Sequence, residues 1–417
     1  MSLNQSYISV LDIGSSKICC MIAEKDANDF NKIIGIGHIE SQGIKAGVVT
    51  DFSLAIKSVS KAINAAEKKA NIKIKNGITV SISSDKTIVK SFKSKVDINE
   101  KKVSRNHINE SFELVMKDIF FSDKKIIHIT PINFILDDVN EIQNPEGMYA
   151  SKLEIEFIVT YIGKSHYKNY IACITQCDVD INRIISSSLA VGSAVLNEQE
   201  LDLGSIIVDM GANTTSLAIF SKNNLVFSKT LAFGGYEITE ALARRFSVTF
   251  EEAEKLKVMH ASVIQSSEAD EVFLEIPSIN FQNNENYVQI TKREVYETIA
   301  PLIIKTLEWI KIILKNSGYG DLTGRVIVYT GGASQIDGLA VLTRDYLNYN
   351  SRVGVARDIK FNFHNVYDSS YSVSAGLIQH AVYENRIHGK LNEFRNSKRK
   401  NKVNFSFIKN WVGENFF

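Results

Sequence analysis

Residues 7–24, YISVLDIGSSKICCMIAE, place two apolar runs on either side of a Gly-Ser-Ser bend. Short apolar runs that are bounded by turn residues predict β-strands, so this segment is expected to form a β-hairpin. A third apolar run, IIGIGHI, follows it. Asp51 then opens a segment whose apolar residues recur at helical spacing, at positions 52, 56, 59 and 63. The order predicts one α/β unit that extends to about residue 83.

A second stretch, GSIIVDMGANTTSLAIF at residues 204–220, repeats the same layout of apolar strand, aspartate, small-residue bend and apolar strand. The chain therefore contains a repeat of about 200 residues. A chain of 417 residues is also longer than one compact core usually holds. Together these features predict two similar α/β lobes that frame a cleft.

Both bends carry residues that suit phosphate binding. They are Asp12, Gly14, Ser15, Ser16 and Lys17 in the first bend, and Asp209, Gly211, Asn213, Thr214 and Thr215 in the second. Small residues let backbone N–H groups approach a phosphate, and a carboxylate can organise the metal ion that offsets its charge. Either bend alone can equally be an ordinary hairpin turn, because Gly, Ser, Asn and Thr favour turns.

A third element, Thr330-Gly331-Gly332-Ala333-Ser334, follows the apolar run RVIVYT. It predicts a backbone without bulky side chains, on which a flat base or a ribose can rest. Its alternative is a turn that caps a helix.

These three elements, in this order, resemble the phosphate-1, phosphate-2 and adenosine motifs of the actin, heat-shock chaperone and sugar kinase superfamily, over residues 7–380. The segment around Gly234-Gly235, with Glu254 and Lys257 after it, is similar to the helices that hold the ribose and base there. The resemblance implies an α/β, actin-like fold of two lobes with duplicated subdomains, and ATP with Mg²⁺ as cofactors. It implies the following nucleotide-binding residues: Asp12, Gly14, Ser15, Ser16, Lys17, Asp209, Gly211, Asn213, Thr214, Thr215, Gly234, Gly235, Glu254, Lys257, Gly331, Gly332 and Ala333, with Asp12 and Asp209 organising the metal through water.

Residues 85–165 are rich in Lys, Asn and Ile and predict a separate small α+β insertion. Within the superfamily, the bacterial cell-division family FtsA carries a relocated subdomain at this place, and the chain resembles that family. The implied subdomains are 1–84 with 166–201 and 355–385 (IA), 85–165 (IC), 202–236 with 322–354 (IIA) and 237–321 (IIB).

The end of the chain combines a basic linker, residues 386–403, with the segment NFSFIKNWVGENFF at residues 404–417. At helical spacing this segment gathers an apolar face of Phe405, Phe407, Ile408, Trp411, Val412 and Phe416. Such a helix behind a basic linker suits the headgroup region of an anionic bilayer. Its alternative is a terminal helix that docks on the protein itself or on a partner, and the linker can also be a plain solvated spacer.

Departures from the superfamily pattern concern hydrolysis. Active ATPases of the superfamily carry a Gln or Glu that orients the attacking water, whereas Ser187 or a neighbouring serine takes that place here. The second bend has Ser216 in place of a second acidic residue, and Ala212-Asn213 in place of Gly-Gly. Nucleotide binding without fast hydrolysis is therefore expected, and no catalytic residue is assigned.

The net charge of +1 gives no reason to expect nucleic acid as a partner. The resemblance to FtsA implies a peripheral protein on the cytoplasmic face of the inner membrane at the division site. It would assemble head to tail, bind the C-terminal peptide of FtsZ and recruit later division proteins. The alternatives are a PilM-like pilus-assembly protein, a chaperone-like ATPase, and a scaffold that no longer binds nucleotide.

Overall fold

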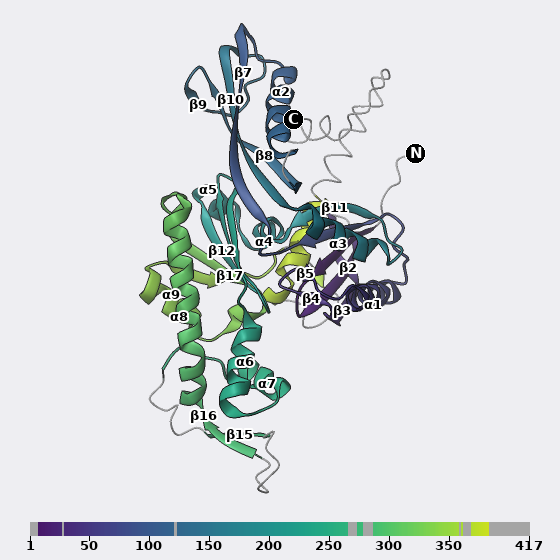
Figure 1. Cartoon of the computed structure of the whole chain (residues 1–417), viewed down its shortest axis with the longest axis vertical. Coiled ribbons are helices and arrows are strands. Elements are labelled where there is room, and N and C mark those ends of the chain that lie inside the picture. Colours follow the sequence, from purple (N-terminus) through teal and green to yellow (C-terminus); the bar gives the residue numbers. More distant parts are fainter. Residues whose placement is uncertain are drawn as a thin grey trace.

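A computed structural model of the chain describes residues 7–26, 29–120, 123–265, 273–277, 287–357, 360–361 and 368–382. The predicted basic linker and the amphipathic helix with Phe405 to Phe416 lie outside the described residues. Two lobes, each built on its own sheet, lie side by side, and an inserted subdomain projects from one end of the molecule (Figure 1).

The first lobe is built on a sheet with the strand order β11-β6-β1-β2-β3-β19. Its strands are β1 (Tyr7–Ile13), β2 (Lys17–Asp26), β3 (Asp29–Glu40), β6 (Ile78–Ile82), β11 (Ile181–Ser186) and β19 (Lys360–Phe361). Strands β1 and β2 pair antiparallel up to Ile13 opposite Ile18, which confirms the predicted hairpin. The short strands β4 (Ile44–Lys45) and β5 (Val48–Val49) connect β3 to the first helix.

Two helices, α1 (Phe52–Ala70) and α3 (Lys164–Thr175), pack side by side against this sheet. Helix α1 begins as predicted, because the Asp51 carboxylate accepts a hydrogen bond from Leu54 N at 2.9 Å. The helix lies close on strand β3: a Cβ added to Gly37 would be only 1.9 Å from Ala62 O. Its buried side therefore faces the sheet, and its polar side faces solvent.

The second lobe repeats the first with the strand order β14-β13-β12-β17-β18. Its strands are β12 (Ser205–Met210), β13 (Thr215–Ser221), β14 (Asn224–Leu231), β17 (Val326–Thr330) and β18 (Asn350–Val353). In both lobes the first three strands pair antiparallel, and the first strand then pairs parallel with a later one. The duplication that the sequence predicted is confirmed.

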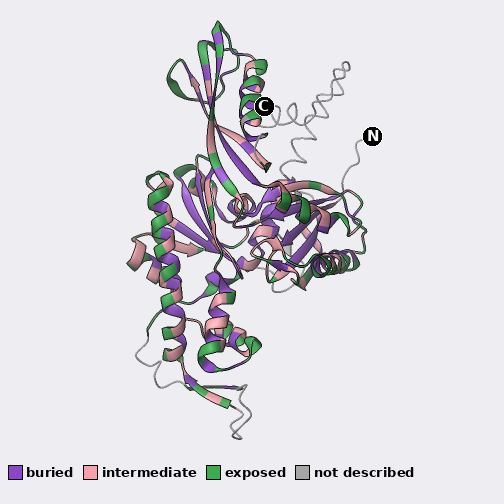
Figure 2. Ribbon diagram, in the orientation of Figure 1, coloured by how far each residue is buried: buried purple, intermediate pink, exposed green. Residues whose placement is uncertain are grey.

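The lobes meet on α4 (Ser187–Val195) and on a helix over residues 372–382. These helices approach closely, because a Cβ on Gly376 would lie 1.8 Å from Ala190 O. Their apolar residues share one buried core with both sheets, as the purple centre of the molecule shows (Figure 2). Helix α5 (Glu198–Leu203) then leads into the second lobe. The two bends that are predicted to bind phosphate are thus carried on sheets that one core holds together.

The inserted subdomain has the strand order β7-β10-β8-β9 with one helix against it. Its elements are β7 (Ile88–Lys102), α2 (Arg105–Phe120), β8 (Lys124–Leu136), β9 (Val139–Ile142) and β10 (Tyr149–Gly163). It has its own core, in which Phe112 and Phe157 meet edge to face at 6.3 Å. The expected α+β insertion is confirmed. It also reaches the second lobe, where Lys222 pairs with Glu141.

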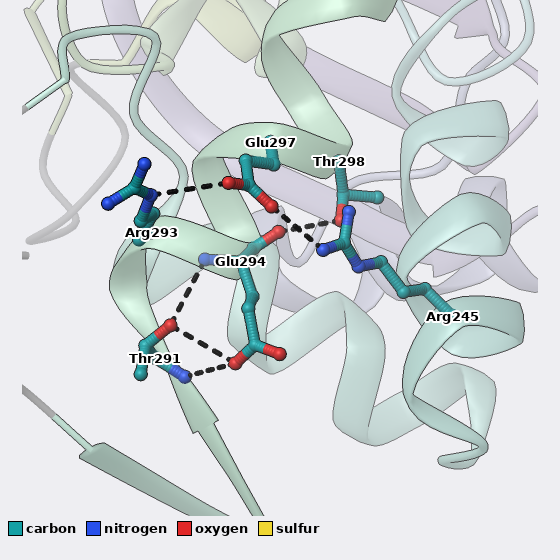
Figure 3. A network of polar contacts seen from close by, with 6 residues as sticks. All are labelled: Arg245, Thr291, Arg293, Glu294, Glu297 and Thr298. Atoms are coloured by element: carbon teal, nitrogen blue, oxygen red, sulfur yellow. Dashed lines mark hydrogen bonds and ion pairs between the residues drawn. The ribbon is translucent and has the colours of Figure 1, made fainter. Parts of the chain in front are cut away.

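The rest of the second lobe is mainly helical. Its elements are α6 (Gly235–Phe246), α7 (Phe250–His260), β15 (Phe273–Pro277), β16 (Tyr287–Thr291), α8 (Lys292–Ser317), η3 (Gly320–Leu322), η4 (Gly332–Gln335) and α9 (Leu339–Leu347), with η5 (Ser369–Tyr371) before the final helix. Thr291 and Glu294 form a capping box at the start of α8 (Figure 3). Arg245 pairs with Glu297 at 3.0 Å and joins α6 to α8.

Candidate functional site

The two bends have the same backbone geometry. Gly14 N donates to Lys17 O at 2.9 Å in the first, and Gly211 N donates to Thr214 O at 2.8 Å in the second. Each glycine is tightly placed, since a Cβ on Gly14 would lie 2.9 Å from Lys17 O. Each bend is a hairpin turn, which is the alternative that the sequence left open. The two turns occupy equivalent places in the two lobes, and this distinguishes them from isolated turns.

Two carboxylates converge from the two sheets. Asp12 is buried and accepts a hydrogen bond from Ser81 Oγ at 2.8 Å. Burial raises the pKa of Asp12, while Ser81 and the charge of Lys17 oppose that rise. Burial, and after it the negative charge of Asp12, raises the pKa of Asp209 to about 7. The negative charge of Asp12 therefore acts on Asp209 across the lobes, and a cation is favoured between them.

Lys17 is the cation that the first bend supplies. Its Nζ donates to Ser370 Oγ at 2.8 Å and lies 3.8 Å from the ring centroid of Tyr371. Burial lowers the pKa of Lys17, and nearby negative charges, including those of Asp12 and Asp209, oppose this. The bend thus reaches Ser370 and Tyr371, which are not among the residues that the sequence predicts for the site. No motif in that segment would have identified them.

The glycine-rich element lies against the second bend. Strand β17 ends at Thr330, and Gly331 follows with φ +84°, which favours glycine. A Cβ on Gly331 would lie 2.5 Å from Asp209 Oδ1, and one on Gly235 would lie 3.2 Å from the Cβ of Ala333. The structure therefore brings the predicted adenosine element next to the predicted phosphate bend.

The start of α6 rests on the same bend, because Gly235 N donates to Gly211 O at 2.9 Å. Lys257 lies beside it and donates from Nζ to Gly235 O at 3.0 Å and to Glu254 Oε2 at 2.7 Å. Glu254 and Lys257 are thus placed together, one turn apart on α7, facing the beginning of α6.

Other predicted residues have structural partners of their own. Asn213 Nδ2 lies 3.5 Å from Glu237 Oε1, whose carboxylate also accepts from Gly234 N at 2.7 Å. Thr215 is fully buried and donates to Phe233 O at 2.8 Å, so its hydroxyl secures the bend in this state. Ser16 lies in the bend with its carbonyl oxygen accepting from Ser41 N at 2.9 Å.

The serines at the start of α4 are those that the resemblance predicts in place of the water-orienting residue. Ser186 caps the helix, and Ser188 bonds to Ser228 at 2.9 Å. Ser187 Oγ is buried and has no hydrogen-bond partner among the described residues. In this state the serines support the helix and present no carboxylate or amide to a water.

Within the described ranges, the His, Cys, Asp and Glu side chains form no group of three that could hold a metal ion directly. Two separate aspartates that act through water molecules remain the predicted arrangement. No helix in the described part of the chain has the length and apolar character needed to span a bilayer.

Solved structures show the same architecture. The chain is similar to a structure titled "PilM-PilN type IV pilus biogenesis complex", with a TM-score of 0.63 and 15% identity over 90% of this chain and 98% of that one. It is also similar to MreB5 of Spiroplasma citri bound to ADP, with a TM-score of 0.53 and 14% identity over 93% and 99% of the two chains. The fold is that of an actin-like protein with two lobes.

Sequence comparison narrows this class. Family models described as "Cell division protein FtsA" and "SHS2 domain inserted in FTSA" match residues 206–376 and 86–161. The cell division protein FtsA of Rhizobium meliloti is 30% identical over 85% of this chain and 82% of its own length. That of Borreliella burgdorferi is 26% identical over the whole of both chains. The chain belongs to the FtsA family.

Lys17 provides a test of the first bend. Exchange to glutamine removes the cation but keeps a side chain of similar length. A hydrogen bond from a charged group contributes about 1.5–3 kcal/mol, so Lys17→Gln should weaken ATP binding roughly 10- to 100-fold. Adenosine, which has no phosphate, should bind as it does to the unchanged chain. Equilibrium binding of both ligands measures this, and an equal loss for both would contradict the assignment.

Proposed function

We propose that the chain binds ATP with Mg²⁺ between its lobes and acts as an actin-like adaptor of cell division. The observation that carries this proposal is the electrostatic interaction among Asp12, Lys17 and Asp209, which come from equivalent bends of two duplicated sheets. The triphosphate of ATP is strongly anionic, and backbone N–H groups together with one lysine can bind it. Mg²⁺ would supply the positive charge that offsets both the phosphates and the two carboxylates.

Each part of the site has a distinct role in this proposal. Gly14, Ser15, Ser16 and Lys17 contact phosphates from the first lobe, and Gly211, Asn213, Thr214 and Thr215 shape the facing bend. Asp12 and Asp209 orient the waters of the metal ion. Gly331, Gly332 and Ala333 support the adenosine, with Gly234, Gly235, Glu254 and Lys257 beside it. The MreB5 structure has the same fold and is bound to ADP, which supports a nucleotide as the ligand in this proposal.

Slow hydrolysis is part of the proposal. Transfer of a phosphoryl group to water requires a residue that positions the water. Ser187 heads α4 with its hydroxyl buried, so it does not aim a strong acceptor into the site in this state. ATP would therefore act mainly by holding the lobes together, and the closed form would assemble head to tail.

Membership of the FtsA family and the sequence of the tail support the proposed membrane and partner roles. We propose that residues 404–417 attach the protein to the cytoplasmic face of the inner membrane, where it binds the C-terminal peptide of FtsZ and recruits later division proteins. The similarity to the PilM–PilN structure does not favour a role in pilus assembly, because at 15% identity it concerns the fold alone.

Co-sedimentation with anionic liposomes tests the adaptor role. The full chain should pellet with the liposomes, and more so with ATP and Mg²⁺, whereas a chain that ends at Lys402 should stay in the supernatant. Nucleotide binding by the shortened chain serves as the control for its folding. If both chains stay soluble while both bind ATP, the tail is a docking helix and the membrane role is wrong.

A further inference from the structure

Helix α1 carries a row of exposed residues on the side that faces away from the sheet. They are Leu54, Lys57, Lys61, Asn64 and Lys68, all exposed. Their spacing of three and four residues places them on one face of the helix. We call Lys57, Lys61 and Lys68 the lysine row. It extends about 16 Å along the helix axis.

The lysine row has no acidic side chain opposite it. None of its three lysines forms an ion pair with an acid of the described chain. The acids nearest in sequence are engaged elsewhere: Glu67 is buried and pairs with Lys73, and Asp51 caps the helix. Residues 51–75 contain six lysines against two acids, although the whole chain has a net charge of only +1. The positive charge is thus concentrated on this surface.

The neighbouring helix extends the same surface. Helix α3 packs beside α1 on the outside of the first lobe (Figure 1) and contains Lys168, which is exposed. The segment Lys164–Thr175 has no acidic residue. Green patches along α1 in Figure 2 mark this outward side. The two helices together present a basic surface.

We propose that this surface is a second membrane contact, which rests on anionic phospholipid headgroups. Lysine is a flexible point charge that attracts anionic lipid without requiring a shaped pocket. Leu54, 41% exposed at one end of the row, can enter the headgroup boundary. Single-stranded nucleic acid would call for aromatic platforms, and an acidic peptide for an apolar anchor pocket. The lysine row contains neither, so charge complementarity favours a flat anionic surface.

The inference rests on the proposed membrane role but does not use the tail. Residues 383–403 between the last described helix and the tail can extend at most about 70 Å, which allows the tail and α1 to meet the same bilayer. Contact through α1 would fix which side of the first lobe faces the membrane. The tail alone, on a linker, would leave that orientation open.

Full-length variants test the proposal. The triple change Lys57→Gln, Lys61→Gln, Lys68→Gln removes the row, and Lys305→Gln, Lys311→Gln, Lys315→Gln removes the same charge from exposed positions of α8. Each lysine near an anionic surface contributes about fivefold to binding. The first variant should therefore lose at least about tenfold in partition onto phosphatidylglycerol vesicles at low salt, and the second should change less than about twofold. Thermal unfolding and ATP binding verify that both variants fold.

Trp411→Glu in the full-length chain separates the row from the tail. With this change, weak salt-sensitive binding to phosphatidylglycerol vesicles should remain, binding to phosphatidylcholine vesicles should be absent, and removal of the lysine row should abolish the remainder. If Trp411→Glu alone abolishes all binding, or if both triple variants bind alike, the lysine row is no membrane contact and the inference is overturned. If Trp411→Glu changes nothing while loss of the row removes binding, the proposed tail anchor fails and the row stands.

Discussion

Exchange of Asp209 for asparagine should make the nucleotide-free protein more stable at pH 8 and at the same time remove its Mg²⁺-dependent ATP binding. The pKa of Asp209 is raised to about 7 by burial and then by the charge of Asp12. The ionised form is therefore disfavoured in the fold. Each pKa unit corresponds to about 1.4 kcal/mol, so asparagine should add about 2–4 kcal/mol of stability at pH 8.

The stabilisation of the folded state by Asp209→Asn should depend on pH. A carboxyl group whose pKa is raised in the folded state is protonated there at low pH. The destabilisation of the folded state by ionised Asp209 therefore decreases as the pH drops below 7. The advantage of Asp209→Asn should therefore be largest at pH 8 and should shrink toward pH 4. Thermal unfolding at several pH values, with the exposed Asp321→Asn as the control, measures it. A variant that is less stable than the parent at pH 8 would contradict the electrostatic account.

Exchange of Gly331 for alanine should reduce ATP affinity by about 100-fold or more. Gly331 has φ +84°, and a Cβ there would lie 2.5 Å from both Asp209 Oδ1 and Met210 O. The methyl group would displace the carboxylate and occupy the surface where the adenosine is expected. Backbone strain adds a stability cost of about 1 kcal/mol. Titration with a fluorescent ATP analogue measures the loss.

Gly318→Ala is the matched control. Gly318 also has a positive φ, of +74°, but an added Cβ there meets no atom within 4 Å. The Gly318→Ala variant should therefore have a backbone strain similar to that of Gly331→Ala but keep the ATP affinity of the parent. If the two variants bind ATP equally well, the element at 331–333 does not lie in the nucleotide site.

Local chemistry made much of the fold predictable. The bend at residues 14–16 and the helix start at Asp51 depend on residues near one another in sequence, and both predictions are confirmed. The capping box of Thr291 and Glu294 is local in the same way. The duplication was predictable because two aspartate-containing bends repeat the same layout. The inserted subdomain was predictable from a change in composition, and its own core at Phe112 and Phe157 confirms it.

Contacts between distant segments were not predictable. Lys17 meets Ser370 and Tyr371 more than 350 residues later, and neither belongs to a recognisable motif. The burial of the Thr215 hydroxyl against Phe233 depends on how β13 and the chain before α6 pack. The ion pair between Lys222 and Glu141 depends on how the inserted subdomain lies against the second lobe. Such features arise from tertiary packing, which local patterns do not encode.

Direct binding of ATP to the purified, folded full chain tests the central claim. Calorimetric titration with and without Mg²⁺ should show one site per chain, with much weaker binding in EDTA, and Asp12→Ala and Asp209→Ala should each remove it. A folded chain that takes up no ATP in Mg²⁺ would contradict the account and favour a scaffold whose cleft no longer holds nucleotide. Unchanged affinity in both aspartate variants would likewise place the nucleotide elsewhere.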